Sequence, residues 1–358
     1  MHNQRHIAVI LSAPVSAPGF LSCRVLHISR LRRGLPLSLL LMALSLTALR
    51  FAPAQSTAKP QQLVILDTDI GDDIDDAFAL ALVERSPELH LLGITTAFGD
   101  TTLRAQLTLK FLDATGFGNV PVAAGVPTPP KTDFTQTAYA QSPEALRETS
   151  KILHATGPDF ILDQIRQNPG QITLIAIGPQ TNLGAAIDED PATFRKLKRI
   201  VMMGGSVDLG YEGHNYADPE WNILCDIPAA KKVFASGVPI FMMPLDSTLL
   251  KFPPQQLKTF FAQNTPLTNE VHILESQWRA NSKWVTPTPT LFDAMAVAYT
   301  IDSNLCPATP MHITVDDKGY THRSPGTPNT DTCLKSDSAA FFRFYMTRFT
   351  TSQTAAAK

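Results

Sequence analysis

The stretch LVILDTDIGDDIDDAFALALV, residues 63–83, constrains the fold of this chain more than any other feature. It places six aspartates within positions 67–76, between an apolar run typical of a buried strand and a second one typical of a helix. Crowded carboxylates repel one another, which raises the pKa of some of them unless a cation lies in their midst. A helix N-terminus stabilises each charge by only up to about 1 kcal/mol, so the pattern favours a bound Ca²⁺ or Mg²⁺ over a solvated acidic helix cap.

The remainder of the sequence alternates short apolar runs with longer amphipathic stretches, as in a mainly parallel α/β sheet with helices on both faces. The runs expected to form strands buried on both sides are VILDTDI, LLGITT, ITLIAIG, RIVMMGG and PIFMMPLD. Helices are expected around 267–279 and 290–299, followed by a polar hairpin near ITVDDKGYTHR. We predict an open, Rossmann-like α/β fold with a single domain, because no linker divides the chain.

Two segments interrupt this alternation and are long enough to cover a substrate. They are residues 126–149, rich in Pro and Thr, and residues 207–222, which mix Gly, aromatic residues and acids. In an open α/β sheet, ligands bind beyond the carboxyl ends of the strands, which is where the aspartates lie. The sequence therefore predicts the functional site at that edge of the sheet.

The N-terminal segment predicts export. Three arginines precede the apolar run LPLSLLLMALSLTAL, and small residues follow it at the spacing of a cleavage site after Ala54. The apolar core is short for a bilayer span, so a retained membrane anchor is the less favoured alternative. We expect residues 1–54 to be a cleaved signal segment and residues 55–358 to form a periplasmic or secreted domain without stable membrane insertion.

Composition excludes some partners and leaves two thiol arrangements open. The formal net charge is −2 and no dense Lys/Arg face appears, so a nucleic-acid partner is not expected.

Beyond the signal segment remain three cysteines, which are Cys225, Cys306 and Cys333. Cys306 and Cys333 flank a turn-rich segment and are paired in one alternative, whereas in the other all three thiols are buried and reduced. No Cys/His cluster has the spacing of a structural zinc site.

Two other classes of cation site fit the aspartates less well. An EF-hand loop starting at Asp67 needs Gly at its sixth position, where Asp72 stands. A metal-dependent phosphatase also begins with a strand ending in Asp-x-Asp, but it then needs a Gly-Thr-type turn, whereas Ile70-Gly71 leads into further acids. The phosphatase therefore remains the weaker alternative.

The stretch DTDIGDDIDDAFAL opens an ordered series of motifs that continues up to residue 299 with GITTAFGD, PVAAG, IAIGPQTNLG, VMMGGSV, PEWNILCDIPAAKKVF and LFDAMAVAY. This series resembles, in the same order, the signatures of the inosine-uridine preferring nucleoside hydrolases. The resemblance implies calcium-dependent hydrolysis of the N-glycosidic bond of ribonucleosides to ribose and free nucleobase. It also implies that the protein is a homodimer or homotetramer and that its partner is a small-molecule nucleoside, which is its substrate.

The resemblance further implies roles for individual residues. Asp69 would be both a calcium ligand and the base that activates the attacking water. The remaining calcium ligands would be Asp76, Asp293 and the backbone carbonyl of Ile177. Either Asp73 or Asp75 would grip the ribose diol, because this chain is two residues longer at that turn. The other ribose-binding positions would be Asp100, Met203, Asn215, Glu220 and Asn222, with His214 competing for the role of Asn215.

Phe292 departs from the family pattern. Several members carry at this place a His thought to protonate the leaving base, and Phe cannot donate a proton. An exported nucleoside- or ribose-binding protein on a degenerate hydrolase site is therefore the alternative outside enzymes. The candidates for a base pocket are aromatic, since aromatic faces suit flat heterocycles, but packing roles also fit them: Tyr139, Trp278, Trp284 and Phe292.

Overall fold

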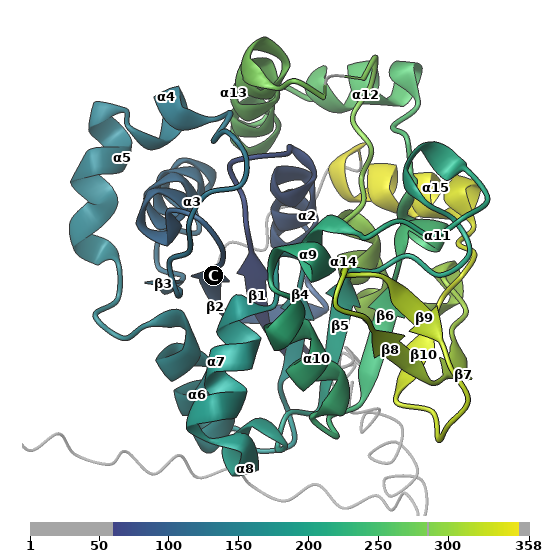
Figure 1. The fold of residues 1–358 in the computed structure, drawn as a ribbon. Coiled ribbons are helices and arrows are strands. Elements are labelled where there is room, and N and C mark those ends of the chain that lie inside the picture. The colour runs from purple at the N-terminus through teal and green to yellow at the C-terminus, as the bar shows by residue number, and fades with distance from the viewer. Residues whose placement is uncertain (1–59, 285, 351–358) are drawn as a thin grey trace, which may run out of the picture. The chain divides into compact units, whose positions relative to one another are not determined.

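The strand that leads into the aspartates, β1 (Gln62–Thr68), lies inside an eight-stranded sheet with the order β3-β2-β1-β4-β5-β6-β10-β7 (Figure 1). The computed structural model describes residues 60–284 and 286–350, so the predicted signal segment, 1–54, lies outside the described residues. Neighbouring strands are parallel except for β7, which runs antiparallel to β10. The other strands of this sheet are β2 (Leu89–Thr96), β3 (Val122–Ala124), β4 (Thr173–Ala176), β5 (Arg199–Met203), β6 (Ile240–Met243), β7 (Thr309–Met311) and β10 (Thr330–Thr332).

The order of the strands reverses between β1 and β4. From β1 the chain proceeds outward through β2 and β3, then returns to place β4 on the other side of β1 and continues to β5 and β6. In doubly wound sheets, such a reversal opens a crevice at the carboxyl ends of the two strands, where ligands bind. The aspartates follow β1 directly, so the topology sets them at this crevice.

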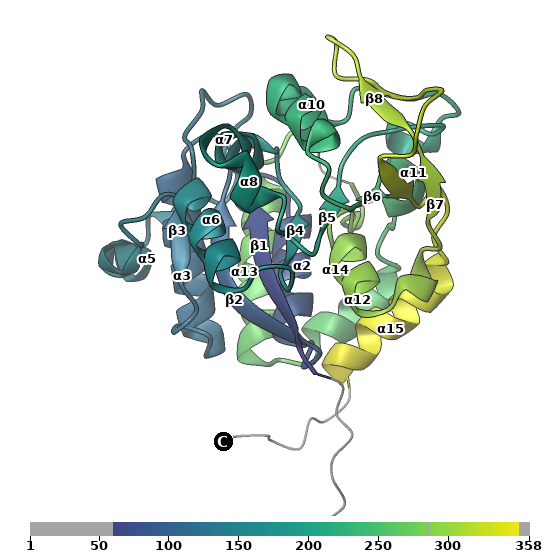
Figure 2. The same ribbon diagram turned by 90° about the horizontal axis from the view of Figure 1, so that it is seen from below.

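Helices cover both faces of the sheet, and each face has its own apolar core (Figures 1 and 2). Side chains alternate along β1, so Val64 and Leu66 join one core and Ile65 joins the other. The first core includes residues of α2 (Asp75–Glu84), α3 (Thr101–Thr115), α12 (Pro254–Phe261), α13 (Pro266–Asn281), α14 (Ala294–Ile301) and α15 (Ser338–Thr350). The second includes residues of α6 (Gly157–Gln167), α7 (Thr181–Glu189), α8 (Pro191–Phe194) and α10 (Ile227–Ala235). The predicted fold class is confirmed, and the described residues form a single domain.

Local expectations are confirmed with two adjustments. The hairpin forms as β8 (Ile313–Val315) and β9 (Thr321–Arg323), and the helix expected around 267–279 is α13. The helix expected from 290 begins only at Ala294, because the N–H of Leu291 bonds to the carbonyl of Leu250 and Thr290 forms a bridge with Lys251. The excursion at 126–149 contains two short helices, α4 (Thr137–Ala140) and α5 (Pro143–Glu148).

Two further features bear on the expectations. Cys306 and Cys333 form a disulfide that ties the segment after α14 to the end of β10, and Cys225 is free. Of the two thiol arrangements, the structure therefore has the bridge. Within the residues 60–284 and 286–350, no helix combines the length and the apolar composition needed to cross a bilayer.

Candidate active site

Three carboxylates meet where α2 and α14 begin. Asp75 and Asp76 open α2, Asp293 directly precedes α14, and one carboxylate oxygen of each lies within 4.8 Å of the others. All three side chains are buried, and burial raises each pKa well above the usual range. Repulsion between the carboxylates raises these pKa values further. Such a cluster holds either protons or a cation, and its hard oxygen atoms suit a divalent cation such as Ca²⁺ or Mg²⁺.

Asp69 lies one residue beyond β1 and faces this cluster. Its side chain is buried, and desolvation raises its pKa to about 7, while the charge of Arg104 opposes the rise. Asp69 in turn raises the pKa of Asp76 and Asp293, so its carboxylate lies within electrostatic reach of both. The structure therefore places two of the acidic residues that the resemblance implies as calcium ligands, Asp76 and Asp293, in one cluster with Asp75, and the third, Asp69, within electrostatic reach of that cluster.

Arg104 holds the turn that carries Asp69. The side chain is 2% exposed and projects from α3 into the space between the ends of β1 and β2. The guanidinium donates to the carbonyls of Asp69, Ile70 (3.0 Å) and Phe98 (2.7 Å) and to the carboxylate of Asp72 (2.8 Å). These contacts fix the turn after β1 to the turn after β2. The sequence reasoning missed Arg104, because an Arg in an amphipathic stretch gives no sign that it is buried.

The first excursion closes over the same turn. Gly71 has φ +125°, and a Cβ atom there would meet the ring of Phe134, so this turn requires glycine. The backbone N–H of Gln136 donates to the carbonyl of Gly71 (3.1 Å), and its side-chain amide donates to the carbonyl of Asp73 (2.9 Å). The side chain of Asp73 is exposed, whereas that of Asp75 is buried in the cluster. Of the two residues left interchangeable by the sequence, Asp75 lies within the carboxylate cluster, while Asp73 lies close enough for its charge to raise the pKa of Asp75.

The opposite wall of the site comes from the ends of β4 and β5 and from α9 (Trp221–Cys225). Glu220 caps α9 and accepts from the backbone N–H groups of Asn222 (2.9 Å) and Gly205 (2.8 Å). Burial raises the pKa of Glu220 to about 7. The side-chain amide of Asn222 donates to the carbonyls of Ile177 (3.1 Å) and Met203 (3.2 Å). Glu220, Asn222, Met203 and Ile177 thus gather at the predicted edge of the sheet.

Other residues named from the sequence lie apart from this group. Asp100 is exposed and caps α3 by accepting from the N–H of Leu103 (2.9 Å). Asn215 is exposed in the second excursion. Its competitor His214 stacks on Tyr216, with ring centroids 3.7 Å apart. The predicted ribose contacts of Asp100, Asn215 and His214 therefore stay predictions.

The aromatic candidates divide into packing residues and surface residues. Tyr139 is buried, its hydroxyl donates to the carboxylate of Glu270, and the Lys110 ammonium lies 3.6 Å from the centre of its ring. Trp278 is 3% exposed and belongs to the core on the α13 side, whereas Trp284 is 80% exposed. Tyr139 and Trp278 thus have the packing roles that were the alternative to a base pocket.

Phe292 stays close to the acidic cluster. It is half-buried directly before Asp293, and its ring packs edge-to-face against Tyr211 with the centroids 6.3 Å apart. Phe292 is therefore the aromatic candidate that the structure keeps beside the carboxylates.

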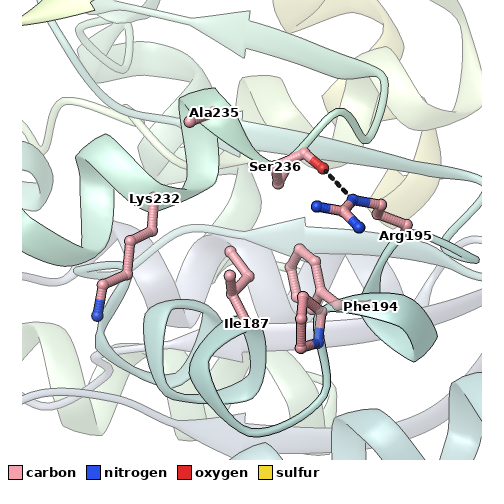
Figure 3. Close-up of a pocket in the computed structure, with 7 residues that line it drawn as sticks. Ile187, Phe194, Arg195, Lys232, Ala235 and Ser236 are labelled. Atoms are coloured by element: carbon pink, nitrogen blue, oxygen red, sulfur yellow. Dashed lines mark hydrogen bonds between the residues drawn. The ribbon is translucent and has the colours of Figure 1, made fainter.

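A hollow of about 170 Å³ between α7, α8 and α10 lies elsewhere on the molecule (Figure 3). Arg195, which precedes β5, donates there to the carbonyl of Ser236 (3.2 Å), which precedes β6. Both residues are at the amino ends of their strands, on the edge of the sheet opposite to the aspartates. This hollow is therefore not part of the candidate site.

Known proteins similar to this chain share both its motifs and its fold. The family described as inosine-uridine preferring nucleoside hydrolase matches residues 64–343. A pyrimidine-specific ribonucleoside hydrolase, RihA of Citrobacter koseri, is 31% identical over 72% of this chain and 84% of its own length. An uncharacterized protein of Schizosaccharomyces pombe is 38% identical over 52% of this chain and 61% of its own length.

A solved structure adds the comparison in three dimensions. The purine-preferring ribonucleoside hydrolase from Gardnerella vaginalis is 25% identical and has a TM-score of 0.68, covering 80% of this chain and 98% of its own. The family match over residues 64–343 includes the acidic turn after β1, the segment around Asp293 and the strands β2 to β10. The chain belongs to the inosine-uridine preferring nucleoside hydrolase family, and its relatives from Citrobacter koseri and Gardnerella vaginalis are ribonucleoside hydrolases.

Proposed function

We propose that this protein hydrolyses the N-glycosidic bond of ribonucleosides, with Ca²⁺ as its cofactor, and releases ribose and free nucleobase. The observation that carries the proposal is the buried cluster of Asp75, Asp76 and Asp293, with Asp69 within electrostatic reach, at the strand-order reversal of the sheet. The named relatives include a pyrimidine-specific and a purine-preferring enzyme. Their names support the reaction class and leave the base open.

The residues of the cluster fit a calcium ion. Their carboxylates are buried and mutually repelling, and within the described part of the chain no cationic side chain forms an ion pair with Asp75, Asp76 or Asp293. Asp69, Asp76, Asp293 and the carbonyl of Ile177 are the proposed ligands. When bound, the ion orients the ribose diol and a water molecule and lowers the pKa of that water.

The remaining chemistry belongs to the side chains. Asp69 takes a proton from the attacking water, as a carboxylate positioned beside that water can do. Asp75 binds the ribose diol from the side of α2, while Glu220 and Asn222 bind the sugar from the side of α9. Because the transition state carries positive charge on the sugar, the surrounding carboxylates stabilise it more than they stabilise the substrate.

Export and assembly are further parts of the proposal. The arginines and apolar run before Ala54 support cleavage there and a periplasmic or secreted protein, and the Cys306–Cys333 disulfide is compatible with an oxidising compartment. Homodimers or homotetramers are proposed from the resemblance alone. N-terminal sequencing of the protein recovered after export, and light scattering during gel filtration, test the two statements.

The reaction itself is tested with a panel of purine and pyrimidine ribonucleosides. The mature protein is incubated with Ca²⁺ or with a chelator, and ribose and base are measured separately. Calcium-dependent release of both products is the expected result, and the preferred member names the base. Tight nucleoside binding without turnover supports the binding-protein alternative, and release of phosphate from phosphate esters with a strict need for Mg²⁺ supports the phosphatase.

A further inference from the structure

Tyr211 connects the two walls of the site. Its hydroxyl accepts a hydrogen bond of 3.0 Å from the backbone N–H of Trp221, the first residue of α9. This contact places the phenol oxygen next to Glu220, the cap of the same helix. On its other side, the ring of Tyr211 packs against Phe292, which adjoins Asp293. The sequence reasoning passed over Tyr211 because it lies in an excursion without a motif of its own.

The hydroxyl of Tyr211 has a proton available. In the described part of the chain, the only hydrogen bond of this oxygen is the one that it accepts, so its own proton has no protein acceptor there. Burial, reinforced by the charges of Glu220 and Asp75, raises the pKa of Tyr211 above its usual range. The phenol therefore remains neutral and keeps its proton, as a hydrogen-bond donor must.

The reaction needs a donor on the side of the leaving base. As the C1′–N bond breaks, its electron pair moves onto the nitrogen of the base, while the water oxygen bonds to C1′ and Asp69 receives the proton of the water. A group that donates to the departing base stabilises the negative charge that develops there. Phe292 has no proton to donate, but it holds the ring of a residue that has one.

We propose that Tyr211 donates a hydrogen bond to the nucleobase as the base leaves, and that Phe292 positions its ring. The base departs as an anion bound to the neutral hydroxyl and takes its proton from solvent, while Asp69 returns its proton to solvent. This proposal rests on the proposed function, since it requires that a ribonucleoside is cleaved at this site.

The test compares Tyr211→Phe with the parent protein on two substrates. One is the ribonucleoside that the parent cleaves best, and the other is p-nitrophenyl β-D-ribofuranoside, whose weakly basic leaving group needs little help from a donor. Phe keeps the ring on Phe292 and removes only the hydroxyl. We expect kcat on the nucleoside to fall about 100-fold and kcat on the nitrophenyl riboside to change less than about threefold, because the loss of one such donor costs about that much.

Tyr216→Phe is the matched control. Tyr216 lies in the same excursion, is 60% exposed and would keep its stacking on His214 as Phe. It is expected to leave both rates unchanged. Thermal midpoints of both variants within a few degrees of the parent show that the fold is retained.

Each other outcome decides against the proposal in a different way. Unchanged rates on both substrates mean that the hydroxyl does not contribute to catalysis. Equal losses on both substrates mean that Tyr211 acts on the sugar or the water and not on the leaving base. A parent protein that cleaves neither substrate contradicts the proposed function itself, and the role of Tyr211 falls with it.

Discussion

Replacing Asp76 by Asn tests whether the acidic cluster is held together by a cation. Asn keeps an acceptor for the hydroxyl of Thr68, which donates to Asp76, and removes one of the three crowded charges. In a chelator, the folded state raises the pKa of Asp76 well above the 3.8 of an ordinary aspartate. A raised carboxylate pKa means that the folded state binds more protons than the unfolded state. The stabilisation that protonated Asp76 gives to the folded state is therefore complete below about pH 4 and is lost as the pH rises toward the folded pKa.

The magnitude follows from the linkage between protons and folding. Each carboxylate that stays protonated in the folded state costs about 1.4 kcal/mol of unfolding free energy per pH unit above about pH 4. Between pH 5 and 7 in chelator, we therefore expect the unfolding free energy of Asp76→Asn to fall less steeply with pH than that of the parent, by up to about 1.4 kcal/mol per pH unit. With calcium, the parent should become the protein with the higher free energy of unfolding. An ion at 1,000 times its Kd stabilises the parent by about 4 kcal/mol and stabilises the variant by less.

Urea unfolding at several pH values, with calcium and with chelator, measures these differences. Asp317→Asn is the matched control, since the Asp317 side chain is 97% exposed and its ion pair is with Lys231 on the surface. Equal pH slopes for the parent and Asp76→Asn in chelator, or equal stabilisation of both by calcium, would refute the reasoning.

Three further predictions concern stability. Changing Cys306 and Cys333 together to Ala should lower the free energy of unfolding by about 3–4 kcal/mol, because the bridge spans 27 positions, and denaturant unfolding without reductant measures it. Trp278→Ala should cost about 3–5 kcal/mol in the same assay and Trp284→Ala less than about 0.5, and equal losses would contradict the burial that separates them. Glu220→Gln should cost about 1–3 kcal/mol, because its amide would face backbone N–H groups that now donate to a carboxylate, and an unchanged midpoint would contradict these contacts.

Five strands of the sheet, β1, β2, β4, β5 and β6, were predictable from sequence because they are short apolar runs, whereas β3, β7 and β10, of three residues each, were not predicted. VILDTDI and ITLIAIG became β1 and β4, but their adjacency was not readable, since it depends on a crossover past two other strands. The short helix α5 was missed although Ser142-Pro143-Glu144 is a helix-start signal, because the surrounding Pro and Thr suggested a loop.

The site was predictable where chemistry and position coincide along the chain. Asp69, Asp76 and Asp293 stand in motifs, and the fold brings them to one place. Asp73 and Asp75 could not be told apart, because a turn two residues longer leaves the start of the helix undetermined in one dimension. The role of Arg104 could not be predicted from the sequence, because its side chain donates to backbone carbonyls, which carry no sequence signal.

The most direct test of the central claim is the turnover of Asp69→Asn at saturating calcium. Asn preserves the shape of the side chain but cannot take a proton from water, so kcat on the preferred ribonucleoside should fall by about 100-fold or more. Unfolding curves of the variant and the parent should remain similar under the same conditions. A variant that turns over within about threefold of the parent would contradict the assignment of Asp69 as the base and, with it, the placement of the chemistry at the end of β1.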